Sequence, residues 1–183
     1  SALPTPAHVW RLPLETLPLE LAMRDHIPGL TPPSMSERKR ILDESQSIAI
    51  VGASSNSARS SYFVATYLLS SSTDFDVYLV NPRETEILGR PVYPSLADLP
   101  VVPDLVDVFR RSEDLPSIAE ETAEIGAKVF WTQLGLWSAD AARVAAKAGL
   151  DVVMDRCTKI EHARFAGGLS LAGFNTGVIS SRR

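Results

Sequence analysis

Residues 52–61 combine small side chains, hydroxyl groups and one guanidinium in a single short stretch of the sequence. Gly52 permits a tight turn, and small neighbours let backbone N–H groups approach an anion closely. The guanidinium of Arg59 suits paired phosphate oxygens. These residue types predict a cradle for a phosphate group, formed by Gly52, Ala53, Ser54, Arg59, Ser60 and Ser61.

This stretch does not carry a complete phosphate-loop motif. Only Gly52 of a G-x-G-x-x-G fingerprint is present, and no second glycine is followed by the lysine of a P-loop. A solvated turn with serine caps would have a similar composition. Its position directly after an apolar, β-branched run favours the binding interpretation.

The residues that follow the second apolar run, at 76–80, indicate which nucleotide cofactor the chain would bind. Domains that bind NAD carry an acidic residue there for the ribose hydroxyls, whereas this chain has Asn81, with Arg83 two residues later. An arginine suits the 3′-phosphate of coenzyme A or the 2′-phosphate of NADP. A surface ion pair of Arg83 with Glu84 or Glu86 is the alternative.

Five short runs predict strands, at 47–52, 76–80, 105–109, 128–132 and 151–154. Helical patterns lie between them. One begins at a capping box of Ser34 and Glu37, and others cover 62–71, 112–126 and 138–148. Apolar strands that alternate with amphipathic helices indicate an α/β fold, namely a doubly wound, Rossmann-type parallel sheet of about five strands with helices on both faces. Ligands of such sheets bind at the carboxyl ends of the strands.

The chain divides into an extension and one domain. Residues 1–33 hold seven of the thirteen prolines and predict a proline-rich N-terminal extension, with a short helix near 19–25. Residues 34–183 form the predicted domain. It includes a glycine-rich C-terminal segment, which we expect to fold back onto the domain or onto a partner chain.

Composition excludes several classes of partner. The net charge is −4, and lysines and arginines do not cluster with aromatic residues, so we expect no nucleic-acid partner. No apolar run approaches the roughly 18 residues that span a bilayer, so we expect no membrane partner. The single cysteine rules out an intramolecular disulfide in this sequence and favours a cytoplasmic setting.

Four segments, 50–54, 80–89, 106–111 and 153–157, together resemble the stand-alone bacterial CoA-binding domain proteins. These are similar in turn to the CoA-binding domain of the succinyl-CoA synthetase α subunit. The resemblance covers about residues 36–164 and implies coenzyme A as the cofactor of the 34–183 domain. Many relatives have Arg-Pro-Ser in the first loop, whereas this chain has Ser60 in the middle position.

The resemblance also implies where the cofactor contacts the chain. The loop at 53–61 would face the pyrophosphate. Asn81, Pro82 and Arg83 would lie near the ribose and its 3′-phosphate. The adenine side would be lined by Phe109, Arg110 and Arg111, and the pantetheine arm by Gln133, Leu134 and Gly135.

No catalytic or metal-binding set is recognisable in the sequence. The three histidines and Cys157 lack metal-ligand spacing, and Glu161 and His162 are expected at the exposed start of a short helix. Cys157 is either a buried hydrophobe or a thiol that pairs with that of coenzyme A.

We therefore interpret the chain as a non-catalytic coenzyme A or acyl-CoA binding protein with a sensing or regulatory role. An NADP-dependent oxidoreductase and an interaction module with a vestigial nucleotide site are the alternatives. The expected partner is a small-molecule nucleotide cofactor, and a protein partner or a homo-oligomer stays open.

Overall fold

The computed structural model describes residues 27–166, in two units. The first unit ends at Thr31, and its described part is a turn in which the Leu30 N–H donates to the Ile27 carbonyl (2.9 Å). The second unit begins at Pro32 and contains the sheet. The helix predicted near 19–25 and the glycine-rich segment lie outside the described residues.

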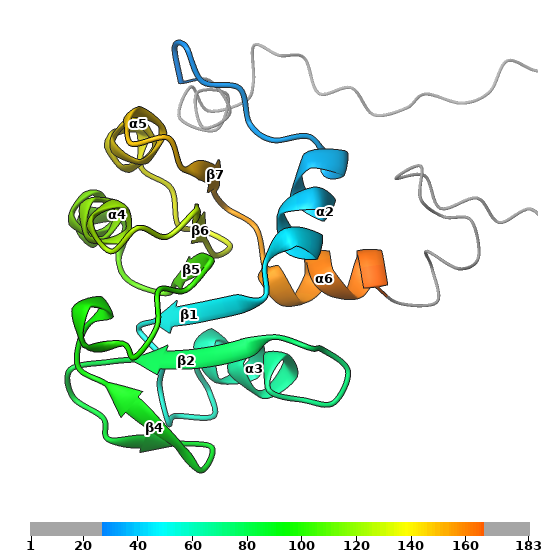
Figure 1. Ribbon diagram of the computed structural model, residues 1–183, viewed down its shortest axis with the longest axis vertical. Coiled ribbons are helices and arrows are strands. Elements are labelled where there is room, and N and C mark those ends of the chain that lie inside the picture. Colours follow the sequence, from blue (N-terminus) through cyan, green and yellow to red (C-terminus); the bar gives the residue numbers. More distant parts are fainter. Residues whose placement is uncertain (1–26, 167–183) are drawn as a thin grey trace, which may run out of the picture. The chain divides into compact units, whose positions relative to one another are not determined.

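The second unit is built on one seven-stranded sheet, shown in Figure 1. Its order is β3-β4-β2-β1-β5-β6-β7, and every neighbouring pair is parallel except β3 and β4. The strands are β1 (Ser47–Val51), β2 (Asp76–Val80), β3 (Glu86–Ile87), β4 (Arg90–Tyr93), β5 (Leu105–Val108), β6 (Val129–Thr132) and β7 (Asp151–Val153). The predicted doubly wound, mostly parallel α/β sheet is confirmed, and all five predicted strands are present.

The strands β3 and β4 were not predicted. They form a hairpin at the β2 edge, and its turn places Leu88 (φ 52°) and Gly89 (φ 71°) in the left-handed region. Glycine adopts this conformation readily but leucine rarely does, so the two residues do not read as a hairpin turn. Pro91 lies inside β4 and makes this strand harder to predict from the sequence, because proline is unusual in the middle of a sheet.

Helices cover both faces of the sheet (Figure 1). The helices α2 (Met35–Glu44), α3 (Ser60–Leu68) and α6 (Thr158–Ala166) pack on one face, and α4 (Leu115–Glu124) and α5 (Ala139–Lys147) on the other. Two short 3₁₀ turns, η2 (Leu96–Asp98) and η3 (Ser112–Asp114), precede β5 and α4. Along β1, Ile48 and Ile50 belong to the core under α3, whereas Ala49 belongs to the core under α4. None of the helices within 27–166 has the length and apolar character needed to cross a bilayer.

A buried ion pair joins α2 to α6. The Arg38 Nε donates to a Glu161 carboxylate oxygen at 2.8 Å, and both side chains are at most 10% exposed. The prediction that Glu161 is exposed was therefore wrong. A glutamate is buried here because its charge meets a guanidinium from a helix 123 residues away, a partner that local sequence does not reveal.

A second buried polar group lies in β5, where Asp107 points toward the α6 side of the sheet. Gln133 Nε2 donates to Asp107 Oδ1 at 2.7 Å, and Thr158 Oγ1 donates to Asp107 Oδ2 at 2.7 Å. This network ties β5, the loop after β6 and the first residue of α6 together. Burial raises the pKa of Asp107 to about 7, and the two hydrogen bonds only partly oppose that rise.

We predict that Asp107→Asn changes the pH dependence of stability. The folded state holds the Asp107 proton up to about pH 7, whereas the unfolded chain loses it near its ordinary pKa. The contribution of the protonated carboxyl is therefore fully present below about pH 4 and is lost as pH rises to about 7. Because asparagine does not titrate, the stability of Asp107→Asn relative to the wild type should increase by about 1 kcal/mol per pH unit between pH 5 and 7.

Urea unfolding of both proteins at pH 5, 6, 7 and 8 measures this difference. Glu120→Gln, an exposed substitution on α4, is the control, and its difference in unfolding free energy from the wild type should change little with pH. A constant difference between Asp107→Asn and the wild type would show that Asp107 does not titrate in this range.

Candidate functional site

The loops after β1 and β5 diverge at the carboxyl edge of the sheet. β1 lies between β2 and β5, and the chain leaves it for α3 on one face. The chain leaving β5 continues to α4 on the other face. This is the point at which the strand order reverses, where open α/β sheets bind their ligands.

Gly52 forms the turn out of β1, and no other residue type fits there without strain. Its φ is +86°, and a Cβ atom on it would lie 3.0 Å from the Phe109 carbonyl oxygen and 3.1 Å from Arg110 Cδ. The Gly52 N–H donates to the Val80 carbonyl at 2.9 Å. Gly52 thus brings the ends of β1, β2 and β5 together.

The loop from Ser54 to Arg59 is ordered by its own side chains. The Asn56 N–H donates to Ser54 Oγ (3.1 Å), and the Ala58 N–H donates to Asn56 Oδ1 (2.9 Å). The Arg59 N–H donates to the Asn56 carbonyl at 3.0 Å. The Ser54 Oγ thus accepts a hydrogen bond that shapes the loop, and its hydroxyl group retains a hydrogen to donate.

The first turn of α3 has no side-chain cap. Arg59 is its N-cap residue and makes no capping hydrogen bond, whereas Ser34 caps α2 and Ser138 caps α5. Ser60 is exposed and Ser61 is buried at the start of the helix. The backbone N–H groups of this turn, with the partial positive charge of the helix end, can accept an anion.

Asn81 links the loops after β1 and β2. Its Nδ2 donates to the Ala53 carbonyl at 2.7 Å, and its Oδ1 accepts from the Arg83 N–H at 2.8 Å. Pro82 and Arg83 are exposed next to this link. Among residues 27–166, the Arg83 guanidinium forms no ion pair, so the surface pair with Glu84 or Glu86 is absent and the charge is available to a ligand.

The residues after β5 are more engaged with the protein itself. Arg110 pairs with Asp114 at 3.4 Å, and Arg111 pairs with Glu113 at 2.9 Å. Phe109 packs against the core on the α3 side. Both arginines are at least 41% exposed at the side chain, so these weak pairs can exchange for a phosphate or a base.

The model of the CoA binding domain family matches residues 46–163, which is most of the second unit and more than half of the chain. The chain belongs to the CoA binding domain family. The family resemblance seen in the sequence is thereby confirmed.

This CoA binding domain protein aligns with nearly the whole length of several relatives. The chain is 40% identical over 131 residues to the uncharacterized protein YneT of Bacillus subtilis (strain 168). The aligned region covers 72% of this chain and 96% of YneT. The chain is 38% identical to a hypothetical protein from Pyrococcus horikoshii OT3 of known structure, with a TM-score of 0.70 and coverage of 77% and 96%. A structure from Thermus thermophilus, cell-free ID.343, has 30% identity and a TM-score of 0.67, with coverage of 72% and 98%.

The three predicted pantetheine contacts of the CoA binding domain lie in different environments. The Gln133 side chain is buried and bonded to Asp107 and Thr158. Leu134 is 58% exposed. Gly135 has a φ of +81°, and its N–H donates to Asp155 Oδ1 at 2.6 Å. Leu134 is therefore the one of the three whose side chain is free to meet a ligand.

Sequence reasoning missed three acids at the carboxyl edge, namely Asp107, Asp155 and Glu84. Asp107 supports Gln133, Asp155 holds Gly135, and Glu84 accepts from the Ser55 N–H at 2.9 Å. The signal for Asp107 was a lone carboxylate in an otherwise apolar strand. The other two are loop acids whose acceptor role depends on which loops the fold places side by side.

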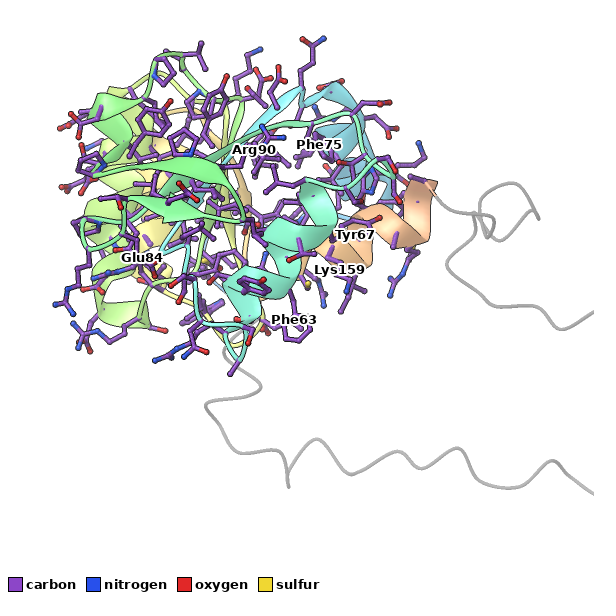
Figure 2. All side chains as sticks on the ribbon, turned by 90° about the horizontal axis from the view of Figure 1, so that it is seen from below. Phe63, Tyr67, Phe75, Glu84, Arg90 and Lys159 are labelled. Carbon is purple, nitrogen blue, oxygen red and sulfur yellow. The ribbon has the colours of Figure 1, made fainter. Side chains whose placement is uncertain are left out.

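Outside this set of residues, the described part of the chain includes a pocket and a half-buried cysteine. A shallow pocket of about 200 Å³ lies between the end of α3 and the amino end of β2, lined by residues that include Phe75 and Arg90. Figure 2 shows these two side chains toward one end of α3, with Phe63 and Glu84 toward the other. Within 27–166, no group of three or more His, Cys, Asp or Glu side chains could hold a metal ion. Cys157 is half-buried and packs against the core.

We predict that Gly52→Ala destabilises the protein more than Gly149→Ala does. Both glycines have a positive φ (86° and 82°), but no atom lies within 4 Å of a Cβ at position 149. The difference in unfolding free energy isolates the clash with the Phe109 carbonyl and should be at least about 1 kcal/mol. Urea denaturation of the two variants measures it, and equal losses would mean that β1 and β5 do not restrict position 52.

Proposed function

We propose that this protein binds coenzyme A or an acyl-CoA at the carboxyl edge of its sheet, without catalysing a reaction on it, and reports the bound state to a partner. The observation that carries the proposal is the uncapped first turn of α3, set beside the Gly52 turn at the reversal of strand order. Backbone amides in that arrangement are suited to a pyrophosphate. The family match over 46–163 supports coenzyme A as the source of that pyrophosphate.

The residues after β2 favour a cofactor with an additional phosphate. Asn81 is neutral and is used to join two loops, so it offers no carboxylate to ribose hydroxyls. The guanidinium of Arg83, which forms no ion pair within 27–166, follows on an exposed turn. Coenzyme A carries such a phosphate on its 3′-oxygen. NADP carries one on the 2′-oxygen, and an oxidoreductase that uses NADP is the rival function that the experiment below separates.

Thermal unfolding with coenzyme A, acetyl-CoA, NADH and NADPH in parallel tests the cofactor. We expect coenzyme A or acetyl-CoA to stabilise the fold, because a ligand at a hundred times its dissociation constant adds about 2.7 kcal/mol. NADH should have little effect. Stabilisation by NADPH without stabilisation by coenzyme A would replace the proposal with the oxidoreductase.

We predict that Arg83→Ala weakens binding of coenzyme A by roughly tenfold, because it removes one charge-assisted contact to the 3′-phosphate. Dephospho-CoA lacks this phosphate, so the substitution should weaken its binding much less. Arg90→Ala removes the same charge from an exposed site that Figure 2 shows away from Glu84, and it is the matched control. Titration calorimetry gives the dissociation constants. Equal losses for the two ligands would show that Arg83 does not contact the 3′-phosphate.

A further inference from the structure

Glu84 places a carboxylate on the loop that begins the candidate site. The Ser55 N–H donates to both of its oxygens, at 2.9 Å to Oε1 and 3.2 Å to Oε2. The two residues are 29 positions apart and come from the loops after β1 and β2. Figure 2 shows Glu84 toward the end of the molecule where α3 begins.

This contact differs from the others in the same loop. The N–H groups of Asn56, Ala58 and Arg59 donate to neutral oxygens within the loop itself. Only the Ser55 N–H, among these four, is held by an anion that comes from another part of the chain. No cationic side chain neutralises this carboxylate, since Glu84 forms no ion pair among the described residues.

We propose that Glu84 is a built-in competitor for this loop, whose carboxylate occupies the Ser55 N–H in the free protein and opposes the anionic groups of the ligand. The inference rests on the proposed function. A phosphate near this amide would meet the negative charge of Glu84, and two anions cannot share one N–H donor without repulsion. Binding therefore displaces the carboxylate, and the affinity is lower than the amides and arginines alone would give.

A rival role for the same contact is a clamp. In that role Glu84 holds the loop in its binding shape, and its loss would weaken binding. The two roles predict opposite changes for Glu84→Gln, which keeps the size of the side chain and removes its charge. Glu86→Gln makes the same change in net charge at an exposed residue two positions later and is the matched control.

The test is titration calorimetry of the wild type, Glu84→Gln and Glu86→Gln with two probes, coenzyme A and inorganic pyrophosphate. We expect Glu84→Gln to bind both probes about three- to tenfold more tightly than the wild type, with little change for Glu86→Gln. Thermal unfolding without ligand checks that each variant is folded. Glu84→Ala, which leaves the Ser55 N–H without a side-chain acceptor, should bind at least as tightly as Glu84→Gln.

The outcomes separate this inference from the proposed function. Coenzyme A binding to the wild type with no gain, or with a loss, in Glu84→Gln would overturn the competitor role and leave the proposed function intact. An equal gain in Glu86→Gln would also overturn it, because the effect would then be one of net charge. A gain with pyrophosphate while coenzyme A binds none of the proteins would support the competitor role and remove the proposed function. Absence of binding to any variant would overturn both.

Discussion

The fold and the candidate site both depend on the close approach of the backbone at the ends of β1 and β5. A Cβ at Gly52 would lie 3.0 Å from the Phe109 carbonyl, so only a glycine lets the two strands end at this separation. With a φ of +86° the chain turns toward α3, while the chain leaving β5 runs toward α4 on the opposite face. The packing constraint and the divergence of the two loops where the strand order reverses are therefore properties of the same residue.

Polar side chains at this edge serve mainly to join loops. Asn81 donates to the Ala53 carbonyl, Asp155 accepts from Gly135, and Gln133 donates to Asp107. Each of these residue types could contact a nucleotide, and here each also makes a hydrogen bond within the protein. In the proposed function, backbone amides at the start of α3 and exposed guanidinium groups at this edge, including those of Arg59 and Arg83, recognise the anion.

The sequence predicts β1, β2, β5, β6 and β7 because each reads as a short apolar run, and the central strands β1, β5 and β6 are buried on both faces. It does not predict the β3–β4 hairpin, whose turn uses a leucine with a φ of 52°. The polar contacts of the site are even harder to predict from the sequence. Thr158 meets Asp107 across 51 positions, and Glu84 turns away from neighbouring Arg83 toward Ser55. Residue type and spacing identify the loops that meet, whereas the choice of partner within them depends on three-dimensional packing.

The free state of the loop after β1 determines what a ligand must change. Four of its amides, those of Ser55, Asn56, Ala58 and Arg59, already have acceptors, so the loop needs little ordering on binding. The cost that remains is electrostatic. Arg59 and Arg83, which form no ion pair among the described residues, attract the phosphates of the proposed ligand, and Glu84 repels them. Under the proposed function these opposing charges lower the affinity of the preformed loop, as would suit a cofactor that is bound and released.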